Sequence, residues 1–313
     1  MKKLIRAAAI AATTAGSASA ATIYEGKGLT YKLKGDFQIQ LRKDVGADQK
    51  LDVEFDDLEL KNTVIYDLGD DMKAFGQLDF GYKNSADAKS GYNGSQLEEA
   101  YVGLQFGNVS VSIGQQDFAV DSFGVDAQIE DKLKEDRFDA TATSGNDVVR
   151  VDVNMDNFTL IATTELEAAS EDSADGKGFD IFLSTSVAGV NLGAAYQNFD
   201  EDPTVSGDVD VWGISASFDA GFAEFGVDYS KADDGTTETD QYNLMTVVPV
   251  ADTTDLGLGL TKVDDGSTDE TEWYANVVYK FPAQKNVSVF AEVADTDKDG
   301  VKMGYLAGMR VKF

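Results

Sequence analysis

The sequence predicts an all-β protein, folded as a transmembrane antiparallel up-and-down β-barrel of about 16 strands. Three observations support this fold class. Apolar and polar residues alternate along many short segments, which is the pattern of strands with one apolar and one polar face. Apolar runs are broken by Asp, Glu, Lys or Gly well before the roughly 20 residues that a membrane-spanning helix needs. Short turns alternate with long polar connections, as in barrels of the bacterial outer membrane.

The N-terminus has the pattern of an export signal that is removed. Three basic residues flank or precede an apolar run over residues 4–15, and an A-x-A cleavage pattern ends at Ala20. We therefore expect residues 1–20 to be a signal peptide and residues 21–313 to form the mature outer-membrane barrel. An ordinary N-terminal helix is the alternative, and the combination of charge, apolar run and cleavage pattern disfavours it.

Composition excludes several kinds of chemistry. The chain has no Cys and no His, which removes disulfides, thiolate metal sites and catalytic triads that use a His base. The run D-x-D-x-D-G at residues 295–300 resembles an EF-hand loop, but Leu306 stands where the bidentate Glu is required. We therefore expect no enzymatic activity, no cofactor and no metal site.

The chain is strongly acidic. Its 26 Lys and Arg against 56 Asp and Glu give a net charge of −30, which becomes −33 when Lys2, Lys3 and Arg6 leave with the export signal. Nucleic acid is not an expected partner, because its recognition calls for a basic face. Two interpretations of the acidity stay open: a pore that attracts cations, and adaptation to a salty habitat.

The clearest strand is the first, residues 29–42, whose odd positions are mostly apolar and whose even positions are polar. In a membrane barrel the apolar face contacts lipid and the polar face lines water. The last strand ends on Phe313, an aromatic C-terminus that we expect to act as the assembly signal of the barrel. Between them, further segments with a period of two cover residues 58–64, 72–82, 100–106, 109–113, 149–153, 158–162, 179–187, 190–196, 212–218, 223–229, 242–248, 256–260, 273–281 and 287–293.

The connections between these segments alternate in length. Short periplasmic turns and long outer loops distinguish an outer-membrane barrel from a soluble sandwich, and an even strand count places both termini in the periplasm. We predict short turns at residues 68–70, 107–108, 155–157, 188–189, 219–221 and 282–284, and long acidic outer loops at residues 83–96, 168–178, 200–208, 232–240, 263–271 and 294–300.

One connection, residues 115–146, is too long for an ordinary loop and mixes apolar with acidic residues. We expect this third outer loop to fold inward, to pack on the barrel wall and to present carboxylates to the lumen. A loop that projects outward is the alternative, which the number of apolar residues disfavours. The acidic residues that we expect at the pore constriction are Asp117, Asp121, Asp126 and Glu130.

The chain resembles the general porins of Gram-negative bacteria, the family of trimeric, sixteen-stranded barrels. The resemblance covers essentially the whole mature chain, and its clearest segments are LTYKLKG at residues 29–35, AFGQLDFGY at 74–82, EAYVGLQFG at 99–107 and the strand that ends in Phe313. It implies that the third outer loop narrows the barrel, with its acidic residues facing a basic cluster on the opposite wall. It also implies a homotrimer in contact with outer-membrane lipid and lipopolysaccharide.

The basic wall positions that the resemblance carries over are Lys34 and Arg150, and the strand alternation directs both inward. Arg42 and Lys73 complete the basic residues that we expect on the pore wall.

The sequence departs from the family at other positions. Acidic residues stand near Asp57 and at Glu98 or Glu99 where the family often has Arg, and Gln115 stands where Arg often follows a glycine. The third loop also lacks the P-E-F-G-G tract. These departures favour cations over anions.

The sequence thus predicts an outer-membrane porin, a water-filled channel for the passive diffusion of small hydrophilic solutes and ions, with a preference for cations. The alternatives are an outer-membrane barrel that acts as an adhesin or surface receptor, and a secreted, soluble halophilic β-protein.

Overall fold

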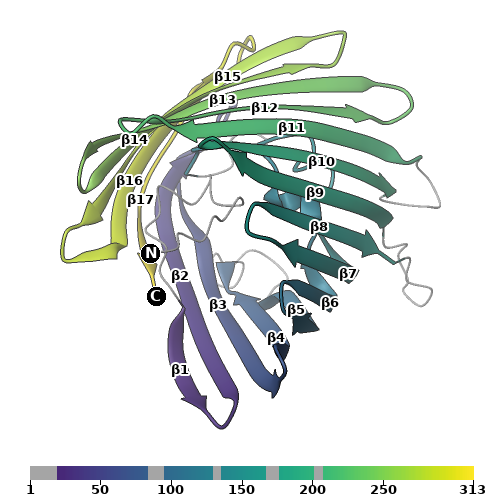
Figure 1. The fold of residues 1–313 in the computed structure, drawn as a ribbon. Coiled ribbons are helices and arrows are strands. Elements are labelled where there is room, and N and C mark those ends of the chain that lie inside the picture. The colour runs from purple at the N-terminus through teal and green to yellow at the C-terminus, as the bar shows by residue number, and fades with distance from the viewer. Residues whose placement is uncertain (1–19, 84–94, 130–134, 167–175, 201–206) are drawn as a thin grey trace.

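Figure 1 shows the computed structural model, in which the strands curve around a hollow and close into a barrel. The structure describes residues 20–83, 95–129, 135–166, 176–200 and 207–313. Strands β2 to β17 follow one another around the ring, each antiparallel to its neighbours, and β17 pairs with β2 to close it. The predicted all-β, up-and-down barrel of sixteen strands is confirmed. Within the described ranges, no helix is both long enough and apolar enough to cross a membrane.

Each of the sixteen predicted segments corresponds to one strand of the ring. The bounds are β2 (Leu29–Lys43), β3 (Asp52–Gly69), β4 (Met72–Gly81), β5 (Gln96–Phe106), β6 (Val109–Asp117), β7 (Ser144–Asn154), β8 (Phe158–Glu165), β9 (Lys177–Val187), β10 (Val190–Asp200), β11 (Val209–Asp219), β12 (Glu224–Asp233), β13 (Glu238–Ala251), β14 (Thr254–Asp264), β15 (Asp269–Phe281), β16 (Gln284–Thr296) and β17 (Gly304–Lys312).

A further short strand, β1 (Ala21–Gly26), was not predicted. It pairs with the first part of β2, from Ala21 opposite Leu33 to Gly26 opposite Leu29, and an irregularity follows Thr22. That irregularity interrupts the alternation of the segment, which is why the sequence pattern did not reveal it.

The second part of β2 pairs with β17, and Phe313 exchanges two backbone hydrogen bonds with Gly35, of 2.8 and 3.0 Å. β1 and β17 therefore lie end to end along the same edge of β2.

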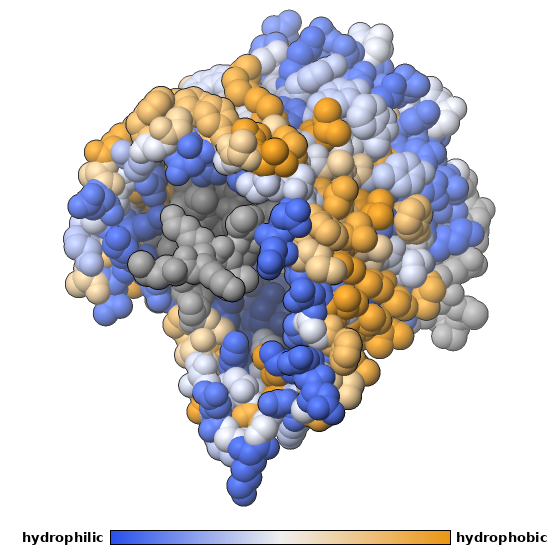
Figure 2. Space-filling view, viewed as in Figure 1, coloured by the Kyte–Doolittle hydropathy of each residue, from blue (hydrophilic) through white to orange (hydrophobic). Residues whose placement is uncertain are grey.

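The distribution of side chains is inverted relative to a soluble protein. Large apolar residues such as Val102, Ile113 and Ile214 are more than half exposed, whereas Gln38 and Gln241 are completely buried. Figure 2 shows hydrophobic residues gathered on the outer surface of the barrel beside its opening. An apolar belt outside and a polar interior are the arrangement of a barrel whose outer face contacts lipid.

The connections alternate in length as predicted, with two exceptions. At one end of the barrel the strands are joined by two to four residues, whereas the β2–β3, β4–β5, β6–β7 and β8–β9 connections at the other end are longer. The predicted long loops at residues 232–240 and 263–271 are wrong, because the flanking strands continue beyond the apolar belt and leave tight turns of four residues. Asp234 and Asp265 hold these turns by accepting backbone hydrogen bonds, including those from Thr237 and Thr268 at 2.7 Å.

Candidate functional site

The connection from β6 to β7 occupies the barrel interior in the part that the structure describes, residues 118–129 and 135–143. It begins with the short 3₁₀ helix η1 (Ala119–Ser122). Phe118, Ala119, Val120 and Phe138 are at most 1% exposed. They form one apolar cluster with inward-facing wall residues of β7 to β11, which are Val148, Ile161, Phe182, Ala195, Phe199 and Val211. The loop is thus held by burial of apolar surface inside a polar lumen.

Glycines in the wall make room for this loop. A Cβ atom at Gly213 of β11 would lie 2.5 Å from the ring of Phe123, and one at Gly226 of β12 would lie 2.9 Å from Val125. Glycine inside a strand often marks such a close approach. The two glycines are visible in the sequence, but the sequence pattern does not show that the residues approaching them belong to the loop.

Polar side chains of the wall bind the loop backbone, which satisfies N–H groups that have no ladder partner. The acceptors come from strands spread over half of the ring, so the loop crosses the inner wall from β8 to β16. The hydrogen bonds run from Ala119 N to Thr163 Oγ1 (3.1 Å), Val120 N to Asp180 Oδ1 (3.0 Å), Val125 N to Asp228 Oδ2 (2.9 Å), Ala127 N to Tyr274 OH (2.9 Å) and Ile129 N to Glu292 Oε2 (2.8 Å).

The four acidic loop candidates have different surroundings. Asp117 ends β6, and Asp121 lies on η1 with its side chain accessible to water. Asp126 accepts a hydrogen bond from Tyr274 OH at 2.7 Å, so it anchors the loop to β15. Glu130 lies outside the described residues.

Asp121 borders an acidic cavity of about 200 Å³ that the loop itself forms, lined by Val120, Asp121, Phe123, Glu135, Asp136, Asp139 and Thr143. Desolvation by the surrounding protein, and then the nearby Asp117 carboxylate, raise the pKa of Asp121 to about 7. Burial raises the pKa of Asp136 to about 7 as well, although its carboxylate accepts backbone hydrogen bonds from Phe138 and Asp139. This part of the lumen therefore carries a negative charge that varies near neutral pH.

The basic candidates lie at different places on the barrel wall. Arg150 lies on β7, beside the strand that leads into the loop, where it donates to the Asp117 carbonyl at 2.9 Å and pairs with Asp152 at 3.0 Å. Lys73 lies near the short turn between β3 and β4, opposite Asp67. Lys34 lies opposite Lys61 on the paired strands β2 and β3. Neither Lys34 nor Lys73 has an ion-pair partner among the described residues.

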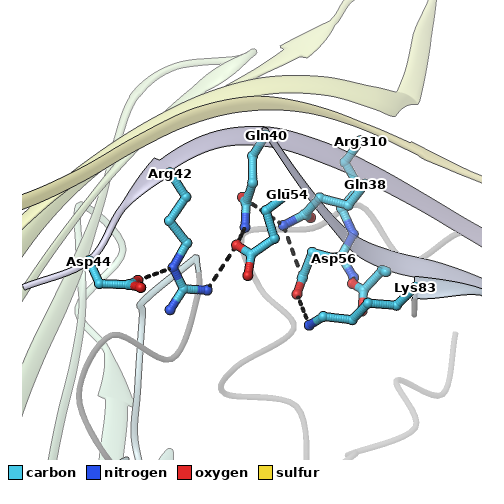
Figure 3. A network of polar contacts seen from close by, with 9 residues as sticks. Gln38, Gln40, Arg42, Asp44, Glu54, Asp56, Lys83 and Arg310 are labelled. Atoms are coloured by element: carbon cyan, nitrogen blue, oxygen red, sulfur yellow. Dashed lines mark hydrogen bonds and ion pairs between the residues drawn. The ribbon is translucent and has the colours of Figure 1, made fainter. Parts of the chain in front are cut away.

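The wall formed by β17 and β2 to β5 carries a network of alternating charges (Figure 3). Arg42 binds Asp44 at 2.6 Å and Glu54 at 3.1 Å. Lys83 binds Asp56 at 2.8 Å. The side chains project from β2 and β3 toward the barrel interior, where Gln40 also donates to Glu54 at 2.9 Å.

Sequence reasoning missed other basic residues of this wall. Arg310 of β17 binds Asp36 at 2.5 Å and also binds Asp57. Lys61 of β3 binds Asp79 at 3.0 Å and Glu99 at 2.7 Å. Both residues lie on polar faces of predicted strands, but only the register across the barrel seam and between β3, β4 and β5 shows which carboxylates they meet.

The family model of the Gram-negative porin matches residues 7–301. The porin-like protein H of Photobacterium profundum is 27% identical over 340 residues, with full coverage of both chains. Among solved structures, OmpT of Vibrio cholerae, expressed in the outer membrane, has a TM-score of 0.77 at 16% identity, covering 93% of this chain and 100% of that one. The anion-selective porin from Comamonas acidovorans has a TM-score of 0.71 at 16% identity, covering 91% of this chain and 100% of that one.

Proposed function

The chain belongs to the Gram-negative porin family, and from this premise we propose that it forms a cation-preferring channel for the passive diffusion of small hydrophilic solutes and ions across the outer membrane. The observation that carries the proposal is the pairing of the wall cations. Arg42, Lys61 and Arg310 each bind two carboxylates, so these three cations are outnumbered by the acids that they contact.

The loop adds further negative charge to the lumen. Asp117 and Asp121 lie near its start, and three further acids line its cavity. A lumen with one sign of charge and low-dielectric walls concentrates ions of the opposite sign and sets the selectivity of a pore. One of the similar folds is that of an anion-selective porin, so the fold leaves the preference to these side chains.

The proposal includes processing and assembly. Removal of residues 1–20 would leave Ala21, the first residue of β1, as the N-terminus. The likeness to a trimer form of Vibrio cholerae OmpT supports a homotrimer, which would be surrounded by lipid and lipopolysaccharide. Passive diffusion through such a pore needs no catalytic group.

We expect the refolded protein to give conductance steps in planar bilayers, and a KCl gradient to give a reversal potential of the sign for K⁺ permeating faster than Cl⁻. The reason is the acidic lumen described above. Replacing Asp121 by Asn should reduce the permeability ratio, and replacing the turn residue Asp234 by Asn should leave it unchanged. Absence of steps, or a reversal potential of the opposite sign, would contradict the proposal.

The preference for cations is expected to fall roughly twofold between pH 8 and pH 6. A carboxyl group whose pKa is about 7 is largely neutral at pH 6 and largely ionised at pH 8, so acidification removes negative charge at Asp121. The charged groups that face it are Asp117, Glu99, Arg150 and Asp136, of which Asp136 titrates in the same direction. Reversal potentials at pH 6, 7 and 8 check this, and an equally steep pH dependence in D121N would exclude Asp121 as its source.

A further inference from the structure

Three carboxylates converge on the inner wall, apart from the loop. Glu59 of β3, Asp79 of β4 and Glu98 of β5 each have an oxygen atom within 4.8 Å of an oxygen atom of the other two. They come from three consecutive strands, so ladder hydrogen bonds fix their spacing.

An irregularity in the β4–β5 ladder brings the third carboxylate into the cluster. Asp79 pairs with Glu99 and the next residue, Phe80, pairs with Leu97, which leaves Glu98 without a partner in the register. An extra residue of this kind redirects a side chain that strict alternation would turn to the other face.

Gly81 makes room for that carboxylate. It lies opposite Glu59, and a Cβ atom there would come within 1.9 Å of Glu98 Oε1. Any other residue at position 81 would therefore displace the Glu98 carboxylate from its place over β4.

Among the described residues one ammonium group, that of Lys61, pairs with this cluster, and Glu59 and Glu98 hydrogen-bond each other. Lys61 is 3.0 Å from Asp79 Oδ2 and 2.7 Å from Glu99 Oε2. This one ammonium group thus contacts two of the four neighbouring carboxyl groups, and those of Glu59 and Glu98 are the other two. Asp79 is only 2% exposed, and its Oδ1 atom is buried without a hydrogen-bond partner among the described residues. A buried charged oxygen without a partner is costly, which points to a cationic ligand at this position.

We propose that Glu59, Asp79 and Glu98 bind a divalent cation of the Ca²⁺ type from the lumen. Ca²⁺ takes six to eight oxygen ligands at about 2.3–2.6 Å in flexible geometry, so carboxylate oxygens up to about 4.8 Å apart can share one ion. Mg²⁺ needs shorter and more regular distances, and softer metals favour nitrogen and sulfur ligands that this wall does not offer. Glu98 is exposed to the lumen, so water can complete the coordination.

Bound Ca²⁺ would link β3, β4 and β5 and would neutralise much of the negative charge beside Lys61. This role goes beyond the proposed channel function, and its test does not use ion permeation. A barrel that proved anion-preferring would still have the site, and a cation-preferring barrel could lack it.

The test is Ca²⁺ titration calorimetry of the refolded full-length mature protein in detergent and about 0.15 M NaCl, which screens diffuse charge binding. We expect one saturable site per protomer with a Kd of roughly 10⁻⁴–10⁻³ M, the range of exposed calcium modules. Glu59→Gln and Glu98→Gln should each weaken binding at least tenfold. The control Asp255→Asn removes a half-buried wall carboxylate on β14 that pairs with Lys280, and it should change the Kd less than twofold.

Gly81→Ala is the sharper variant, because it keeps every carboxylate and moves only that of Glu98. A loss of binding at least as large as that of Glu98→Gln supports a coordinated site. Wild-type affinity in Gly81→Ala would overturn the proposal, as would unsaturable uptake that is equal in wild type, Glu98→Gln and Asp255→Asn.

Discussion

Replacing Phe138 by Ala is expected to lower the free energy of unfolding of the docked loop by about 3–4 kcal/mol. The side chain is completely buried, and its ring lies 4.9 Å from the ring of Phe123, measured between centroids. Phe123 in turn fills the space above Gly213. Truncation leaves a cavity at the centre of the contact that holds the loop against the wall, so the loop should open before the barrel does.

Two measurements check this expectation. Single-channel recordings should show larger and fluctuating conductance, because a released loop no longer narrows the lumen. Limited proteolysis should cut the loop faster in F138A than in wild type. F138L keeps most of the volume and serves as the control, with a loss of less than about 1.5 kcal/mol. If the conductance of F138A is as low and as steady as that of the wild type, the apolar cluster around Phe138 does not hold the loop.

Replacing Arg310 by Gln is expected to destabilise the barrel by about 2–3 kcal/mol and to increase its preference for cations. Asp36 is buried at 4% exposure, and the variant leaves it with Lys312 at 3.2 Å as its remaining cation. Removing one partner of a fully buried ion pair destabilises a protein by about 3–5 kcal/mol. The smaller value is expected here because water in the lumen can solvate the Asp36 carboxylate.

The double variant D36N/R310Q is the matched control, because it removes both charges and should recover part of the stability. Heat- or urea-induced loss of the folded form on gels measures stability, and reversal potentials measure selectivity. A double variant less stable than R310Q, or an unchanged reversal potential in R310Q, would contradict the role assigned to this pair.

The strands could be predicted from the sequence because lipid on one side and water on the other impose a period of two on each of them. β1 could not be predicted, because its six residues, with an irregularity after Thr22, do not show that period. At the two tight turns near Asp234 and Asp265 the sequence pattern predicts long loops, because strand residues beyond the lipid are as polar as loop residues.

The contacts of the loop inside the barrel could be predicted only in part. Composition alone indicated that residues 115–146 mix apolar anchors with acids, and Asp117 and Asp121 lie where that mixture begins. The partners of Asp126 and Arg150 depend on contacts between distant segments, which no local pattern contains. The importance of Lys61, Arg310 and Glu98 depends on register, and a shift of one residue changes which face each side chain occupies.

The seam of the barrel has a consequence for folding. Within the described strands, every ladder of the ring joins neighbours in the chain except that between β17 and β2, which joins residues more than 260 positions apart. Hairpins that are joined by short turns can form early, whereas the seam must wait until all sixteen strands of the ring have been made. Arg310 and Phe313 lie at this last ladder, so the closure of the barrel and its finished wall depend on the same few residues.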